Sequence, residues 1–109
     1  MTQARLGETL DRVAEGDRAA LAALYDAAGP MQYALARRVL GEPAAAAAAL
    51  GDAYARIWDG AEAGRASGLS SGTWLLMVVR HTAIDRRRAG QGAPPGPAAP
   101  EPRLAPGEG

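Results

Sequence analysis

The chain has 109 residues, 12 arginines and no lysine, 12 acidic residues, one histidine and no cysteine, so its formal net charge is zero. This size allows one small domain and excludes a large two-lobed enzyme. The lack of cysteine excludes disulfides, cysteine-ligated metals and cysteine nucleophiles. No apolar run is long enough to cross a membrane as a helix, and no signal-peptide pattern follows residues 1–5. We therefore expect a cytoplasmic protein without membrane insertion.

The composition of the chain changes near Ala89. Of the 21 residues in 89–109, 16 are glycine, proline or alanine, and this stretch shows no apolar periodicity. Such a stretch cannot bury enough apolar surface to offset the entropy of ordering it. We predict a folded domain over residues 5–88 and a disordered linker or tail over residues 89–109.

Glycine and proline separate the first predicted helices. Residues 9–15 extend an apolar spacing that starts at Leu6, and Gly16 ends this segment. Asp17 is placed to cap the next helix, which we expect over residues 17–28.

A glycine–proline pair follows that helix. Gly29 and Pro30 are expected to stop it and to start another over residues 30–40, because proline suits the first helical turn. The apolar stripe expected on the new helix has a spacing of four residues and consists of Met31, Leu35 and Val39.

A long helix is predicted over residues 44–58, where consecutive alanines favour helix formation. Its one-sided apolar stripe consists of Leu50, Tyr54, Ile57 and Trp58. Residues 59–72 are rich in glycine and serine and are expected to form a loop. The last helix is predicted over residues 73–88. We expect its apolar first half, residues 74–79, to be buried on all sides, while its second half is polar and basic.

No segment shows the alternation of a β-strand, so we expect an all-α fold, a compact bundle of about four helices. The zero net charge hides a segregation of charge. Residues 1–79 carry seven arginines and nine acids, whereas residues 80–88 carry four arginines and one acid. A nucleic-acid partner uses such a local concentration of positive charge.

Four sequence blocks now point to a known family. They read DRVAEGD with LYD (residues 11–17 and 24–26), ARRVLGEP (36–43), DAYARIW (52–58) and TWLLMVVRHTAIDRRR (73–88). In this order and spacing they resemble region 2 of the extracytoplasmic-function (ECF) sigma factors of the sigma-70 family, over about residues 8–88. The segment after them resembles the linker that leads to region 4 in that family, and the 109 residues contain no counterpart of region 4.

The resemblance implies a partner for each of two helices. In the family, one helix docks on the β′ clamp helices of core RNA polymerase, and by position this is the helix over residues 44–58. The implied polymerase contacts are Ala47, Ala48, Gly51, Asp52, Ala55 and Arg56. The last helix and the loop before it open the promoter −10 element and hold its non-template single strand. The implied DNA contacts are Arg65, Ser70, Ser71, Arg80, His81, Thr82, Asp85, Arg86, Arg87 and Arg88. An anti-sigma factor is a further candidate partner.

The chemistry of the last helix suits this role. A single strand is held by cations that follow its phosphates and by pockets for unstacked bases. Arginines bind phosphates with two parallel hydrogen bonds, and His81 and Thr82 are short polar residues expected to reach base edges.

The sequence also departs from the family pattern. The docking helix of the family carries acidic and amide residues where this chain has Ala47, Ala48 and Gly51, and only Asp52 remains acidic. This departure leaves an alternative open: a degenerate or stand-alone region 2-like interaction protein, either an anti-sigma decoy or a truncated relic, without productive polymerase binding.

Structural roles are the alternative for most of these residues. The arginines at residues 80–88 also suit a solvated helix end, because cations stabilise helix C-termini. Trp58 and Trp74 suit the core, and Asp52 with Arg56 has the spacing of an ion pair within one helix. A single histidine without cysteine offers no metal site, so no metal or other cofactor is expected. We also expect no enzymatic activity, since no nucleophile has an evident base.

Overall fold

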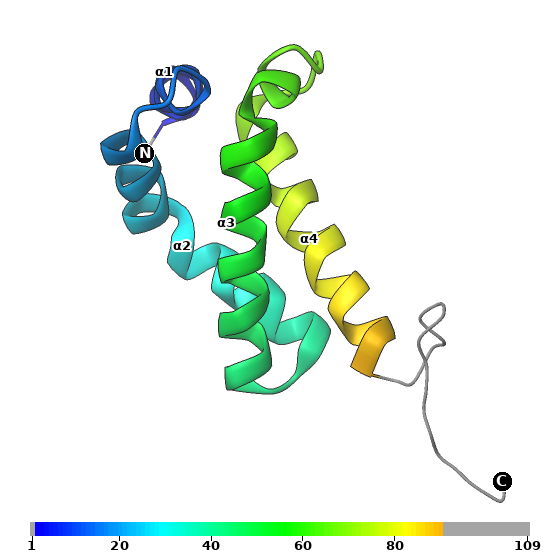
Figure 1. Cartoon of the computed structure of the whole chain (residues 1–109). Coiled ribbons are helices and arrows are strands. Elements are labelled where there is room, and N and C mark those ends of the chain that lie inside the picture. The colour runs from blue at the N-terminus through cyan, green and yellow to red at the C-terminus, as the bar shows by residue number, and fades with distance from the viewer. Residues whose placement is uncertain (1, 91–109) are drawn as a thin grey trace, which may run out of the picture.

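The computed structural model describes residues 2–90, and these form four helices (Figure 1). The helices are α1 (Gln3–Ala14), α2 (Arg18–Leu40), α3 (Pro43–Arg65) and α4 (Ser71–Gly90). Each helix contacts the other three, and the described residues contain no strand. The predicted all-α bundle is therefore confirmed. The predicted disorder of residues 89–109 falls, from residue 91 onward, outside the described residues.

Short polar residues and glycines set the helix ends. The Thr2 hydroxyl accepts a hydrogen bond from the Arg5 amide, so α1 begins six residues earlier than the apolar spacing predicts. Asp17 caps α2 as predicted, with its carboxylate accepting from the Ala20 amide at 3.2 Å. Gly41 ends α2 in the left-handed conformation, at φ 80°, which glycine adopts without steric cost.

One continuous helix replaces the two helices predicted around Gly29 and Pro30, so the prediction of a break there is wrong. Pro30 lies inside α2, where it removes one backbone donor. In Figure 1 the ribbon of α2 changes direction at its middle. The predicted apolar stripe is confirmed in part: Leu35 and Val39 are partly buried against the two apolar clusters, whereas Met31 is 65% exposed and the fully buried positions are Gln32 and Ala36.

The first of two apolar clusters, here called the large-residue core, joins α1 and the first half of α2 to α3 and α4. Its fully buried large side chains are Leu10, Val13, Leu24, Ile57, Leu75 and Val79. The predicted stripe of the third helix is confirmed, with Leu50, Tyr54 and Ile57 buried and Trp58 packed at the edge.

A buried hydrogen bond crosses the large-residue core. The Tyr54 hydroxyl donates to the Gln32 side-chain carbonyl, and both residues are nearly inaccessible to water. Burial of the phenol raises the pKa of Tyr54 to about 12. The Tyr25 ring packs edge-on against Tyr54, with ring centroids 5.1 Å apart. This bond pairs the Tyr54 hydroxyl with the Gln32 side-chain carbonyl, two buried polar groups that the core would otherwise leave unpaired.

The second cluster, here called the alanine cluster, joins the other ends of α2, α3 and α4. It consists of Ala36, Ala46, Ala49 and Ala83, flanked by Tyr33, Val39 and Leu40. The alanine run therefore contributes two buried contacts rather than only helix propensity. Small side chains let helix backbones approach closely. Because the buried residues here are all alanines, this end of the bundle buries less apolar side-chain volume than the large-residue core does.

The third helix is longer than predicted, because α3 continues to Arg65 and only residues 66–70 separate it from α4. The two glycines that suggested a loop lie under the Trp74 ring. A Cβ built on Gly64 would stand 2.5 Å from ring atoms of Trp74, and one on Gly60 would stand 3.7 Å away. The glycines thus seat the tryptophan against the helix. The expectation that residues 74–79 are buried on all sides is wrong, since Leu76 and Met77 are 38% and 40% exposed.

Candidate nucleic-acid and polymerase interface

The basic end of α4 presents most of its predicted DNA contacts to solvent. Arg80, His81, Arg87 and Arg88 are exposed, and none of them forms an ion pair within residues 2–90. Positive charge at this end is therefore available to an anionic partner.

Thr82 does not belong to this exposed face. Its side chain is 2% exposed, and its hydroxyl donates to the Val78 carbonyl at 2.7 Å. A hydroxyl that is buried and bonded within its own helix cannot reach a base edge. The structure therefore removes Thr82 from the set that the resemblance implied, and the reason is the angular position of residue 82 beside buried Val79 and Ala83.

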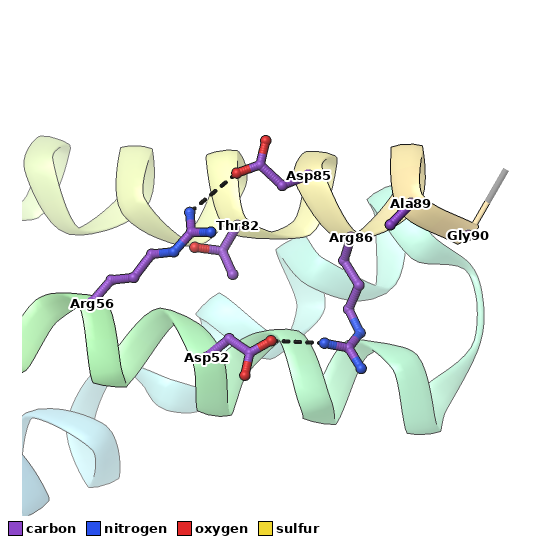
Figure 2. Close-up of a pocket in the computed structure, with 7 residues that line it drawn as sticks. All are labelled: Asp52, Arg56, Thr82, Asp85, Arg86, Ala89 and Gly90. Atoms are coloured by element: carbon purple, nitrogen blue, oxygen red, sulfur yellow. Dashed lines mark hydrogen bonds and ion pairs between the residues drawn. The ribbon is translucent and has the colours of Figure 1, made fainter. Parts of the chain in front are cut away.

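Asp85 and Arg86 form ion pairs with side chains of α3 while remaining about half exposed. The Arg86 guanidinium lies 2.7 Å from the Asp52 carboxylate, and the Arg56 guanidinium lies 3.2 Å from the Asp85 carboxylate. We call these two contacts the reciprocal ion pairs, because each helix contributes one carboxylate and one guanidinium (Figure 2). They replace the pair expected within one helix between Asp52 and Arg56.

The reciprocal ion pairs border an open groove of about 560 Å³ between α3 and α4. Its lining consists of Asp52, Arg56, Thr82, Asp85, Arg86, Ala89 and Gly90. The four charged side chains remain between 42% and 58% exposed, so water and a partner reach them. The groove brings predicted polymerase contacts and predicted DNA contacts into one site.

The other predicted polymerase positions form a surface of small residues along α3. Ala47, Gly51 and Ala55 are exposed and Ala48 is half-buried. Nothing lies within 4 Å of a Cβ built on Gly51. This stretch of α3 is therefore open and shallow, with charge only at Asp52 and Arg56.

The predicted DNA contacts at and around the loop between α3 and α4 are Arg65, Ser70 and Ser71, and they have structural roles of their own. The Ser70 hydroxyl accepts from the Thr73 amide at 3.2 Å, at the start of α4, and Ser71 is half-buried. Arg65 bonds Glu62 at 2.7 Å and lies 3.7 Å from Asp11, so the pKa of its guanidinium is raised by the hydrogen bond to Glu62 and by the nearby acids. Of the three, only Ser70 and Arg65 are exposed enough to contact a partner directly.

Comparison with known proteins now identifies the family. The model of sigma-70 region 2 matches residues 24–92, which include α3, α4 and most of α2. The chain belongs to the sigma-70 region 2 family.

Curated relatives of the chain are named as sigma factors. An ECF RNA polymerase sigma factor SigK from Mycolicibacterium vanbaalenii is 34% identical over 93 residues, covering 85% of this chain and 47% of the relative. A second ECF RNA polymerase sigma factor SigK, from Mycobacterium sp. strain KMS, is 34% identical over 84 residues, covering 77% and 44%. The chain thus spans about half the length of the curated relatives it matches. No solved structure matches it.

Within this region 2 domain, sequence reasoning missed an apolar surface. Met31 and Leu76 are exposed and line, with Leu6, Ala28 and Leu75, a groove of about 290 Å³ between α1, α2 and α4. The signal was present in the helical spacing, because Leu75 and Val79 cannot face inward on α4 unless Leu76 and Met77 turn outward.

Residues 2–90 offer neither a metal-ligating cluster nor a membrane-spanning helix. Residues 2–90 contain no group of three or more metal-ligating side chains. Over the same span, no helix has both the length and the apolar character needed to cross a membrane.

Proposed function

We propose that this sigma-70 region 2 domain binds core RNA polymerase through the outer face of α3 and holds the single-stranded −10 promoter element with α4. The observation that carries the proposal is the placement of the two faces on adjacent, packed helices. Open small residues lie along α3, and the second half of α4 carries arginines that have no ion pair within residues 2–90. This role places the protein in the cytoplasm, as a transcription initiation factor rather than an enzyme.

The DNA part of the proposal rests on charge and exposure. No acidic side chain of the described residues forms an ion pair with Arg80, Arg87 or Arg88. The positive charge of these arginines is therefore not neutralised within the domain. Arginine guanidinium groups bind phosphate oxygens bidentately and stack on bases. His81 stands beside them as the polar residue that remains exposed once Thr82 is excluded. We assign phosphate contacts to the arginines and a base-edge contact to His81.

The polymerase part rests on shape. Exposed small residues at Ala47, Gly51 and Ala55 let the backbone of a partner helix approach α3 closely. The β′ clamp helices are the partner that the family resemblance implies, and the relatives are named as RNA polymerase sigma factors. Asp52 and Arg56 flank this strip and supply charges of both signs for orientation.

Binding to purified core polymerase tests the docking face. We expect a labelled chain to bind in a titration at moderate salt and to be displaced by a full-length sigma factor. Ala55→Arg should weaken this binding at least tenfold because the new side chain fills the shallow strip. Ala27→Arg, at an exposed alanine of α2, is the matched control and should leave the affinity unchanged. Equal binding by both variants would move the docking face away from α3.

Salt dependence tests the DNA face. For single strands, log K falls with log salt by about 0.7 per phosphate contact. Replacing Arg87 and Arg88 with alanine should therefore flatten the slope by up to about 1.4 and weaken binding of a −10 oligonucleotide. Arg5→Ala, at an exposed arginine of α1, is the control. An unchanged slope in the double variant would show that these arginines are only solvated.

A second candidate function has its own observation. The docking strip lacks acids at Ala47, Ala48 and Gly51, and its one carboxylate, Asp52, is paired with Arg86. A region 2-like interaction protein that binds an anti-sigma factor without binding polymerase fits this depletion. A folded chain that fails to compete with a full-length sigma factor, yet binds an anti-sigma factor, would favour this function.

A further inference from the structure

We propose that the reciprocal ion pairs act as an internal latch, which withholds Arg86 from DNA until a partner engages the outer face of α3. The inference rests on the proposed function and concerns how its two binding faces are coupled. Asp52 and Arg56 belong to the predicted polymerase face, and Asp85 and Arg86 belong to the predicted DNA face. The charged groups of one face therefore neutralise those of the other.

The geometry supports a contact that competes directly with phosphate. The Arg86 guanidinium is 2.7 Å from the Asp52 carboxylate, the distance of a charge-assisted hydrogen bond. A DNA phosphate needs the same guanidinium donors. In the free chain, Arg86 must give up Asp52 before it can serve a phosphate fully, whereas Arg87 and Arg88 have no such competitor within residues 2–90.

The accessibility of the four groups makes the latch reversible. Each side chain is about half exposed and borders the open groove, so a partner can reach it without unfolding the domain (Figure 2). Exposed ion pairs are weak, so a partner can break them at little cost. A cationic group of the partner that pairs with Asp52 frees Arg86 for a phosphate. The Arg56–Asp85 pair need not open, and while it is closed Arg56 neutralises a carboxylate that would otherwise repel the DNA.

The effect is reciprocal by thermodynamic necessity. If a partner on α3 makes Arg86 available and so tightens DNA binding, DNA that takes Arg86 must tighten binding of that partner by the same factor. The latch therefore predicts that the free chain binds DNA more weakly than the partner-bound chain does. The difference arises because the Arg86 guanidinium is paired with Asp52 in the free chain and is available to a phosphate in the bound chain.

The first test uses the free full chain and a short fluorescent single-stranded oligonucleotide with the −10 sequence. Asp52→Asn should tighten binding about three- to fivefold, the range that a weak exposed ion pair allows, and steepen the salt slope by about 0.7, the value for one added phosphate contact. Asp59→Asn is the matched control, because Asp59 is exposed two turns further along α3, loses the same charge and has no ion pair among the described residues. It should tighten binding less than twofold and leave the slope unchanged.

A double-variant cycle separates the latch from general electrostatics. In an Arg86→Gln background, Asp52→Asn should no longer tighten DNA binding or steepen the salt slope, because the guanidinium that it releases is gone. If Asp52→Asn tightens binding equally with and without Arg86, or no more than Asp59→Asn does, the latch is overturned while the proposed function stands.

The second test adds saturating core polymerase. At saturation the wild-type chain and Asp52→Asn should hold the oligonucleotide equally tightly, since the pair is already broken in both. A threefold or larger advantage that persists in the complex would overturn release by polymerase. If wild type and all variants bind neither polymerase nor DNA, the proposed function fails and the latch fails with it.

Discussion

The two ends of the bundle are held together by different means. The large-residue core fixes α1 and the first half of α2 with fully buried leucine, isoleucine and valine side chains. The alanine cluster holds the opposite ends of α2, α3 and α4, and the reciprocal ion pairs add contacts between α3 and α4 alone. Hydrophobic stabilisation scales with the apolar area removed from water, so the first end supplies most of the folding free energy.

The candidate site lies at the end with less buried area. A partner that separates or shifts α3 and α4 there disturbs small contacts and exposed ion pairs rather than the main core. Most of the stability therefore comes from one end of these helices, and the candidate site lies towards the other end. Substitutions can test that separation, and their expected effects decrease in the order given below.

The largest contrast is expected between core truncations at the two ends. Leu24→Ala should lower the free energy of unfolding by about 3 to 5 kcal/mol, because it leaves a cavity in the large-residue core. Ala36→Gly in the alanine cluster should cost about 1 to 2 kcal/mol, from lost helix propensity and one methyl group. Urea unfolding followed by circular dichroism measures both values. Equal losses would contradict the unequal division of stability.

The contact between Gly64 and Trp74 gives the next effect. Gly64→Ala should cost about 1 to 3 kcal/mol, because the added Cβ would overlap the indole ring and force the helices apart. Gly51→Ala is the matched control in the same helix, where the new methyl meets nothing within 4 Å. It should stabilise the domain by up to about 1 kcal/mol. A stabilised Gly64→Ala variant would show that Trp74 does not sit on this glycine.

The buried Tyr54–Gln32 bond should give a similar or smaller loss. Tyr54→Phe leaves the Gln32 carbonyl unpaired and should cost about 1 to 3 kcal/mol. Because burial raises the pKa of Tyr54 to about 12, its phenol stays neutral in the folded state after the unfolded state begins to ionise near pH 10. Its contribution is therefore present below pH 10 and is lost as the pH rises towards 12. Tyr54→Phe should reduce this loss in alkaline denaturation.

The reciprocal ion pairs should give the smallest change in stability. Asp52→Asn should cost at most about 1 kcal/mol at low salt, because the pair is exposed, and less at high salt because ions screen it. Thermal melts at two salt concentrations measure the difference. A loss as large as that of Leu24→Ala would mean that charge, and not burial, holds this end.

Local sequence patterns predicted where helices occur better than they predicted how long each helix is. The capping of α2 by the Asp17 carboxylate and its end at Gly41, where glycine adopts a positive φ, are local effects that act over a few residues, so the sequence was sufficient there. The break at Pro30 and the loop over residues 59–72 were misjudged because proline and glycine usually end a helix locally, whereas α2 passes through Pro30 and α3 continues to Arg65. Packing against the other helices outweighs that local preference here, a tertiary effect that the sequence does not display.

The candidate site was predicted as a set of residues but not as an arrangement. Exposure of Arg87 and Arg88 followed from the polar second half of α4. The partner of Asp52 did not, because a spacing of four residues suggested Arg56, whereas the register between α3 and α4 selects Arg86. Burial of Thr82 depended on the same register. Which residues meet across two helices is set by their packing, and one sequence alone does not encode it visibly.

The unbroken passage of α2 through Pro30 has a consequence for amide hydrogen exchange. Pro30 has no amide, so the ladder of backbone bonds in α2 is weakest near the boundary between the two ends of the bundle. Amides before this point are tied to the large-residue core and exchange mainly when the whole domain unfolds. Residues 36–40 lie beside the alanine cluster instead, and we expect their amides to exchange by opening of that half-helix alone. Hydrogen exchange should therefore divide this one continuous helix into a slower and a faster part.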